Sequence, residues 1–204
     1  MRPAAAAQSP RAVEAAALVS AALQRYGSAA TYRLDFEQES YWALADSSTT
    51  ARGTLTYKRP GRVSVRYDDG GRIVVTSDSL HVYAPTAGQF FASPVDSSDV
   101  AIDPARLLRA FTPDGAAPFA PVDPLSDGSR VVSLVPRSSH GEPARLEVTI
   151  DPGDATLSRI MAVSSSGDRT TYWIKSSSFG VSVADSEFVL RRPPGSQLLP
   201  GSPF

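Results

Sequence analysis

Apolar and polar residues alternate along most of the chain. The pattern begins at Tyr32, where apolar side chains at every second position are separated by charged ones. A period of two places the apolar side chains on one face of a β-strand and the charges on the other. The pattern predicts strands around residues 32–36, 55–57, 63–67, 72–76, 80–84, 131–135, 146–150, 157–163, 169–175 and 187–191.

Turn-forming residues separate several of these strands. Asp68-Asp69-Gly70-Gly71 and Ser166-Gly167-Asp168 stand between neighbouring runs, and such residues favour tight turns between antiparallel strands. Many short strands without a regular strand–helix alternation are typical of one antiparallel sheet. We therefore predict a mainly β fold, with a sheet that is strongly curved or rolled into a barrel.

Two segments have helical spacing instead. Residues 10–26 follow Ser9-Pro10, a cap and first-turn signal, and end before Gly27, which is suited to a helix C-terminus. Asp103-Pro104 repeats the start signal. It precedes a short helix whose apolar side consists of Leu107, Leu108 and Phe111.

The remaining segments predict loops and ends. Residues 85–101 and 112–129 are rich in Pro, Ser, Asp, Gly and Ala and are too long for hairpin turns, so they resemble lids or binding loops. The proline-rich tail from Arg191 onward is predicted to leave the sheet and run over the surface. We expect a single domain over 1–204, with flexible ends at 1–9 and 196–204.

The composition excludes several functions. Lysine and arginine number 20 against 21 acidic residues, so no positive excess favours nucleic acid. The absence of cysteine rules out disulfides, thiolate metal sites and a cysteine nucleophile. The two histidines, His81 and His140, match no common ligand spacing. We interpret His140 as a solvated loop residue and His81 as a wall residue, with a ligand contact as the alternative.

Catalytic and phosphate-binding motifs are missing as well. The chain has no Gly-x-Ser-x-Gly, no His-Glu-x-x-His, no phosphate loop and no Gly-x-Gly-x-x-Gly. We therefore expect no enzyme, no metal and no cofactor. No stretch approaches the ~20 apolar residues of a membrane span. The alanine-rich start fits either a mature exported chain or a cytoplasmic N-terminus.

Short motifs occur in a characteristic order along the chain. Lys58-Arg59-Pro60 closes one strand, and alternating apolar residues follow within one turn. Around it stand Phe36-Glu37-Gln38, Gly53-Thr54-Leu55-Thr56-Tyr57, Ile73-Val74-Val75, Leu80-His81-Val82-Tyr83 and, later, Leu146-Glu147-Val148-Thr149-Ile150 and Phe188-Val189-Leu190-Arg191-Arg192-Pro193. In this order the chain resembles the LolA-type periplasmic lipoprotein carriers, from the first helix to Gly195.

The resemblance implies a fold and a function. It implies an unclosed antiparallel barrel, with an N-terminal helix and short lid helices over an apolar cavity. The implied role is to take acylated lipoprotein cargo from an inner-membrane ABC transporter to an outer-membrane receptor, as a periplasmic monomer and without catalysis. Arg59 matches the family arginine that hydrogen-bonds the lid and links opening to ligand binding.

The sequence also suggests which residues line the cavity. We predict that its wall and lid contain Leu55, Tyr57, Val63, Val65, Tyr67, Leu107, Leu108 and Phe111. Two departures from the family occur here. Val63 and Val65 replace frequent aromatic residues, and His81 replaces a frequent tryptophan.

Three other interpretations remain open. One is a lipid- or lipoprotein-sensing regulator with the same fold, and another is a small all-β enzyme acting on an apolar substrate. A secreted structural sandwich is the third, and it predicts a filled interior that binds no apolar probe.

Overall fold

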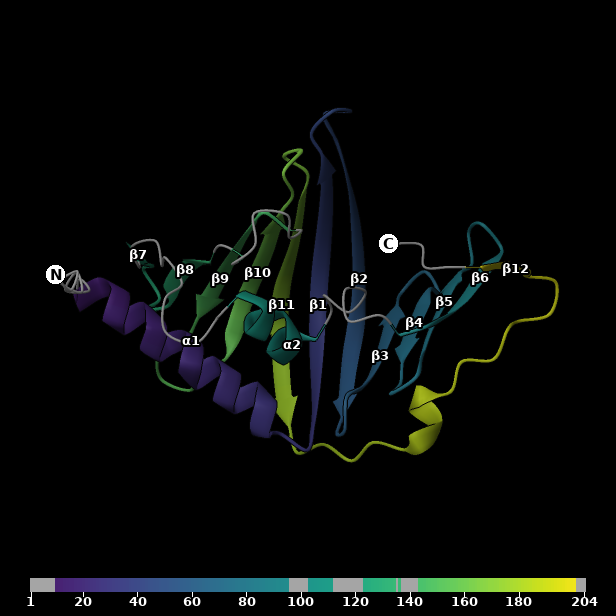
Figure 1. Cartoon of the computed structure of the whole chain (residues 1–204), viewed down its shortest axis with the longest axis horizontal. Helices are drawn as coiled ribbons and strands as arrows, with labels where there is room; N and C mark the ends of the chain where they lie inside the picture. The colour runs from purple at the N-terminus through teal and green to yellow at the C-terminus, as the bar shows by residue number, and fades with distance from the viewer. Residues whose placement is uncertain (1–9, 96–102, 112–122, 135, 137–142, 201–204) are drawn as a thin grey trace, which may run out of the picture.

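One large sheet extends across the molecule, with both α-helices on the same side of it (Figure 1). The computed structural model describes residues 10–95, 103–111, 123–134, 136 and 143–200. The helices are α1 (Pro10–Ser28) and α2 (Pro104–Phe111). The strands are β1 (Thr31–Trp42), β2 (Ser47–Lys58), β3 (Arg62–Tyr67), β4 (Arg72–Val75), β5 (Ser79–Ala84), β6 (Gln89–Pro94), β7 (Asp123–Pro124), β8 (Arg130–Leu134), β9 (Arg145–Ile150), β10 (Leu157–Val163), β11 (Arg169–Phe179) and β12 (Gln197–Pro200).

The order of the strands confirms an unclosed sheet. It runs β12-β6-β5-β4-β3-β2-β1-β11-β10-β9-β8-β7, so β12 and β7 are two separate edges. All neighbours are antiparallel except β12, which pairs parallel to β6. The prediction of a mainly β, unclosed antiparallel sheet with an N-terminal helix is therefore confirmed.

Alternation along the strands creates two different faces. The inner face, defined here as the face that α1 and α2 cover, carries the apolar side chains of β1, namely Tyr32, Leu34 and Phe36. On β2, Gly53 lies opposite Phe36, and a Cβ there would collide with the carbonyl oxygen of Arg66. Glycine is thus required where the Phe36 ring lies across the neighbouring strand.

Helix α1 packs on this face through small and aromatic residues. Ala15, Val19, Ala22 and Tyr26 recur at helical spacing and are at most 1% exposed. Alanine at two of these positions lets the helix approach the strands closely. The predicted helix 10–26 is confirmed and continues to Ser28.

Four sequence predictions differ from the structure at the sheet's ends. The predicted strand 187–191 is instead a short 3₁₀-helix, η1 (Asp185–Phe188). The predicted loop 85–101 contains β6, the predicted loop 112–129 contains β7, and the tail after Arg191 returns to the sheet as β12. In η1, tertiary ion pairs override the local apolar pattern, and β12 forms because β6 offers an open edge.

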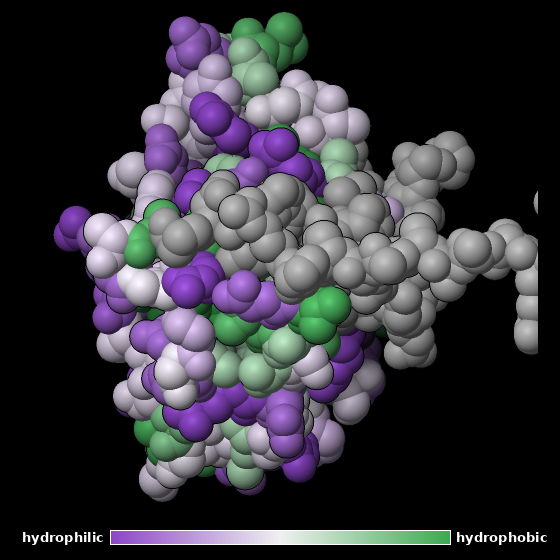
Figure 2. All heavy atoms as spheres, turned by 90° about the vertical axis from the view of Figure 1, so that its left-hand side faces the viewer, coloured by the Kyte–Doolittle hydropathy of each residue, from purple (hydrophilic) through white to green (hydrophobic). Residues whose placement is uncertain are grey.

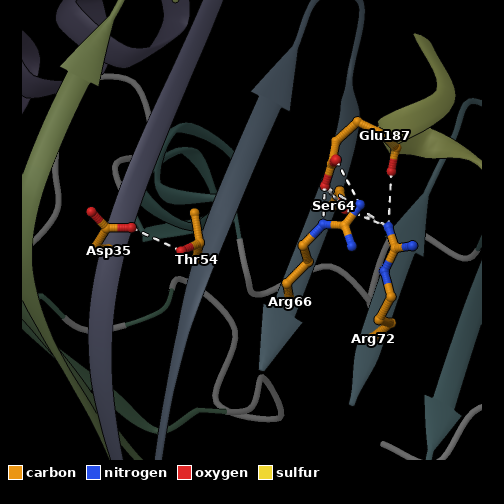
Figure 3. Close-up of polar contacts among 6 residues, drawn as sticks. All are labelled: Asp35, Thr54, Ser64, Arg66, Arg72 and Glu187. Atoms are coloured by element: carbon orange, nitrogen blue, oxygen red, sulfur yellow. Dashed lines mark hydrogen bonds and ion pairs between the residues drawn. The ribbon is translucent and has the colours of Figure 1, made fainter. Parts of the chain in front are cut away.

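Ion pairs fasten η1 to the outer face of the sheet (Figure 3). Glu187 accepts two hydrogen bonds of 2.7 Å from the Arg66 guanidinium and one of 2.9 Å from the Ser64 hydroxyl. Arg72 donates to the backbone carbonyl of Glu187 at 3.0 Å. From η1 the chain continues to β12, so residues 180–200 form a clasp across one half of the sheet (Figure 1).

A second carboxylate joins three strands on the outer face. Asp35 on β1 accepts hydrogen bonds from Thr54 on β2, at 2.8 Å (Figure 3), and from Ser176 on β11, at 2.6 Å. These bonds, with that from Ser176 the stronger, lower the pKa of Asp35. The outer face is therefore held by polar contacts, whereas the inner face is apolar.

The β1–β2 hairpin extends beyond the other strands (Figure 1). Near its tip Leu44 is fully exposed and Trp42 is 44% exposed. Figure 2 shows a hydrophobic patch at the top of the molecule, where the hairpin ends. The other hydrophobic patches visible in this view have hydrophilic residues beside them. Among the described helices, none combines the length and hydropathy needed to cross a bilayer.

Candidate functional site

The predicted wall residues come together on the inner face. Leu55 pairs with Val65, and Tyr57 pairs with Val63, across β2 and β3. These four side chains are buried, and Tyr67 is half-buried against the same core. The period of two was a sufficient signal to identify this surface.

Helix α2 covers this surface and is the segment that the sequence predicts to be a lid. Its residues Leu107, Leu108 and Phe111 are buried in the same apolar cluster as the wall residues. The helix also packs against α1. The structure thus places all eight predicted apolar site residues in one cluster. Seven of them are buried, and Tyr67 is half-buried.

The space between lid and wall is small. A narrow apolar pocket of about 30 Å³, the middle pocket, lies there. That volume suits one or two water-sized groups rather than an acyl chain. Sequence reasoning missed some of its lining, although the same alternation could have found it, namely Phe36, Ile160, Tyr172 and Ile174.

An aromatic row separates the middle pocket from a wider opening. Phe36 meets Tyr67 and Tyr172 edge to face, with ring centroids 5.8 and 5.7 Å away. Beyond Tyr67 lies a groove of about 360 Å³, the upper groove, on which Ala51, Val82 and Phe91 also lie. Burial raises the pKa of Tyr67 to about 12, so its hydroxyl stays neutral while it donates to Gln38 at 3.2 Å.

A buried carboxylate connects the lid to the sheet. Asp103, 6% exposed, accepts hydrogen bonds from the Tyr32 hydroxyl and, at 3.2 Å, from the backbone N–H of Ala105. The second bond caps the N-terminus of α2. Burial raises the pKa of Asp103 and also that of Tyr32. The Tyr32 ring stacks on Tyr57 at 4.7 Å, which places the phenol beneath the lid.

Arg59 lies at the opposite end of the inner face from the upper groove. Its Nη2 donates to the carbonyls of Gly27, at 2.8 Å, and Ala29, at 3.3 Å, at the end of α1. These contacts join β2 to α1. Within the described residues no hydrogen bond joins Arg59 to α2, so its role as a latch on the lid stays a prediction.

Arg59 also lines an open pocket of about 490 Å³, the lower pocket. Arg106 and Arg109 reach it from α2, and Tyr57 and Val63 contribute from the wall. Pro104 and Leu107, on the other side of the same helix, line the middle pocket. Helix α2 is therefore the partition between the middle and lower pockets.

His81 lies away from this site. His81 pairs with Val74 and alternates with the core residues Leu80 and Val82, so it points to the outer face, beside Phe90 at 5.7 Å. The interpretation of His81 as a wall residue or ligand contact of the cavity is wrong, because alternation along the strand turns its side chain away from the inner face. His140 lies outside the described residues. In the described ranges no group of three or more acidic or histidine side chains could hold a metal ion.

Solved structures share this fold at low sequence identity. An uncharacterized conserved protein from Thermus thermophilus is 11% identical with a TM-score of 0.58, over 91% of this chain and 99% of that one. A DUF1329 family protein from Desulfovibrio piger is 8% identical with a TM-score of 0.51, over 89% and 98%. A LolA superfamily protein from Nitrosomonas europaea is 12% identical with a TM-score of 0.45, over 86% and 97%.

A sequence family model gives the more specific result. No curated protein matches the chain. The model described as outer membrane lipoprotein carrier protein LolA matches residues 27–191, which include the wall strands, the lid and Arg59. The chain belongs to the LolA family.

Proposed function

We propose that this protein is a periplasmic carrier that binds the acyl chains of lipoproteins and delivers them to the outer membrane. An inner-membrane ABC transporter would supply the cargo, and an outer-membrane receptor would accept it. The role is binding and release, without catalysis. The observation that supports it best is the continuous apolar inner face beneath α2, within a chain of the LolA family.

Binding of an acyl chain beneath α2 requires displacement of the lid, because the middle pocket measures only about 30 Å³. Uncovering Leu107, Leu108 and Phe111 costs about 2 kcal/mol for each side chain, or roughly 6 kcal/mol together. Burial of roughly eight methylene groups offsets this cost, at about 0.8 kcal/mol each. One membrane acyl chain is longer than that, so it can open the lid and still bind.

The same balance favours release. Part of the burial energy of the ligand is used to open α2, so net affinity is lower than the apolar contact alone would give. A carrier between two membranes needs such limited affinity. Closing of α2 over the wall then regains the contacts of its apolar side as the cargo leaves.

Two labelled variants test where an acyl chain binds. The chain contains no cysteine, so Ala51→Cys and Thr50→Cys each give a unique attachment point for an environment-sensitive fluorophore. Ala51 lines the upper groove, whereas Thr50, its exposed neighbour, points to the opposite face of β2. Titration with a fatty acid should give a saturable change at position 51 and little at position 50.

Transport is tested in a second assay. Lipoprotein should move from inner-membrane vesicles to the purified protein and then to outer membrane that carries the receptor. Absence of saturable fatty-acid binding, or equal signals at both labelled positions, would contradict an inner-face site. Binding without either transfer step would contradict the carrier role while leaving a lipid-sensing role.

A further inference from the structure

Three arginines line the lower pocket, and none of them forms an ion pair with a carboxylate of the described residues. Arg59 comes from the end of β2, and Arg106 and Arg109 come from α2. Every ion pair in the described part of the chain, with its acidic oxygen within 4 Å, involves a lysine or arginine other than these three. The guanidinium groups converge on one opening of about 490 Å³.

Among the described residues the acidic group at this opening, Asp103, forms no ion pair within 4 Å with the arginines, although the charges of Arg109 and Arg106 act on its pKa and lower it. Asp103 is the one carboxylate among the described lining residues, and its Oδ1 already accepts from Tyr32 and from the backbone of Ala105. The hydrogen bonds of the Arg59 side chain to Gly27 and Ala29 both use Nη2 and run to backbone carbonyls. A guanidinium has five N–H donors, so Arg59 keeps donors for a ligand.

The pocket has an apolar floor that continues into the candidate acyl site. Tyr57 and Val63 line the pocket and are 9% and 1% exposed. Both belong to the wall that α2 covers. Because α2 separates the lower pocket from the middle pocket, displacement of α2 would join a basic opening to an apolar surface.

We propose that the lower pocket binds the anionic head group of an amphiphile whose acyl chain lies on the inner face. This inference rests on the proposed acyl-binding function and specifies its ligand class. A phosphate or carboxylate accepts planar, paired hydrogen bonds from arginine, which favours such groups over a zwitterionic head. Arg106 and Arg109 would follow the lid, so the head group would contact both sheet and lid.

Soluble short-chain lipids test the preference. Dihexanoyl phosphatidylglycerol is anionic, and dihexanoyl phosphatidylcholine is zwitterionic with the same chains. Isothermal titration calorimetry at low salt should show binding of the anionic lipid about fivefold tighter, as expected for a few half-exposed charge contacts. The preference should decline as salt is added, because screening weakens contacts that solvent reaches.

A double variant and a matched control locate the effect. Arg106→Gln with Arg109→Gln should bring the ratio of the two affinities close to one. Arg130→Gln with Arg145→Gln removes the same charge from β8 and β9, where both arginines pair with glutamates, and should keep the preference. Circular dichroism and thermal unfolding confirm that both double variants are folded.

The outcomes separate this inference from the carrier function. Equal affinity of the wild-type protein for the two lipids, or a preference that survives in Arg106→Gln/Arg109→Gln, overturns the head-group site and leaves acyl binding intact. Binding of neither lipid overturns both. Inorganic phosphate is the third probe. If it binds as tightly as the anionic lipid, the pocket is a free-anion site and the amphiphile assignment is wrong.

Discussion

Asp103 is the residue through which the lid is attached to the sheet. Its carboxylate caps α2 and accepts from Tyr32, whose ring is fully buried between Tyr26 and Tyr57. Burial deprives the ionised carboxylate of the water that would stabilise its charge, and this desolvation is the largest cause of its raised pKa. The hydrogen bond from Tyr32 acts in the opposite direction and is weaker.

The raised pKa of Asp103 predicts a specific pH dependence. Below the ordinary aspartate pKa of 3.8, both the folded and the unfolded states hold the proton, and the contribution of this group to stability is complete. As pH rises through the raised folded pKa, the unfolded chain releases the proton first, and folding loses stability. Asp103→Asn removes this dependence, so its free energy of unfolding should rise relative to wild type as pH increases above about 4.

Urea denaturation of both proteins at each pH measures the difference. The comparison is made between variant and wild type because other carboxylates have lowered pKa values, and their protonation destabilises both proteins in acid. These carboxylates are Asp35, Glu37, Asp154, Asp168, Asp185 and Glu187. A difference that stays constant with pH, or that shrinks as pH rises, would contradict the burial of an ionisable Asp103.

Arg59 gives a second prediction for a single residue. Arg59→Leu removes hydrogen bonds to two exposed carbonyls at the end of α1, which water can replace. The variant should lose no more than about 1 kcal/mol of stability. If the guanidinium stabilises the closed, empty form, the variant should load lipoprotein at least as well as wild type and surrender it poorly.

The two-step transfer assay separates the effects. Loading from inner-membrane vesicles is scored first, and delivery to receptor-bearing outer membrane is scored second. Normal delivery by a folded Arg59→Leu protein would show that this arginine has no latch function. Arg52→Leu is a suitable control, because Arg52 lies on the same strand and pairs with Glu37 on the outer face.

Single residues differ in how well the sequence identifies them. Tyr57, Val63 and Tyr67 could be assigned to the wall because a strand's period fixes which side chains share a face. The lower pocket could not be predicted in this way. Arg106 and Arg109 come near Arg59 only through the packing of α2 on the sheet, and local patterns carry no information on such long-range contacts.

At the scale of elements, η1 and β12 both depend on the rest of the sheet. η1 packs on its outer face, and β12 pairs with its edge strand β6. Lys58 and Arg62 both reach Asp185, at 2.8 and 2.9 Å, while Arg66 binds Glu187. Phe188 is 5% exposed, and the Arg62 guanidinium lies over its ring, 5.1 Å from the centroid. The clasp is therefore held in place by side chains on β2 and β3 rather than by its own helical propensity.

This arrangement predicts unequal costs for two glutamates. Glu187→Ala removes three charge-assisted hydrogen bonds. It also removes the carboxylate 3.8 Å from the Arg72 guanidinium, whose Nε is already buried without a hydrogen-bond partner. The expected loss is about 2 kcal/mol of unfolding free energy. Glu14→Ala breaks a single surface contact of 3.3 Å with Arg130 and should cost less than about 1 kcal/mol.

Equilibrium urea unfolding measures both values. Limited proteolysis adds a local readout, since loss of the clasp should expose residues 180–196 to cleavage while the remaining sheet resists. Equal stability losses in the two variants would contradict an anchoring role for Glu187.

The same elements show the limits of sequence analysis. Strands β1, β3, β5 and β9 alternate clearly, and the structure confirms them. Residues 187–191 also contain apolar side chains, yet the ion pairs on Asp185 and Glu187 stabilise a 3₁₀ turn. Strand β12 is short and contains proline, and its pairing becomes favourable only because β6 is an open edge.

At the scale of the whole molecule, the unclosed sheet has one apolar face and two helices to cover it. Helix α1 is long and covers its part of the face with fully buried side chains. Helix α2 is short and relies on one buried polar contact and one apolar side. The two covers therefore differ in strength, and α2 is the one that a ligand can displace at lower cost.

That difference predicts that leucine-to-alanine substitutions at two places lower stability in both but change ligand affinity in only one. Leu107→Ala shortens a lid side chain, and Leu146→Ala shortens a core side chain on β9, where Leu146 pairs with Leu134 and Ala162. Both should lower stability, by about 2 to 4 kcal/mol for the fully buried Leu146 and less for Leu107. Only Leu107→Ala weakens the closed lid, so it alone should bind a fluorescent fatty acid more tightly, by about threefold to tenfold.

Fluorescence titration measures the affinity of each variant for the fatty acid, and urea unfolding measures its free energy of unfolding. Alanine is a good helix former, so the change on α2 alters packing without breaking the helix. A Leu107→Ala protein that binds the probe more weakly than wild type would mean that this side chain contacts the bound ligand instead of excluding it. Tighter binding by both variants would mean that general loosening of the core, rather than release of α2, opens the site.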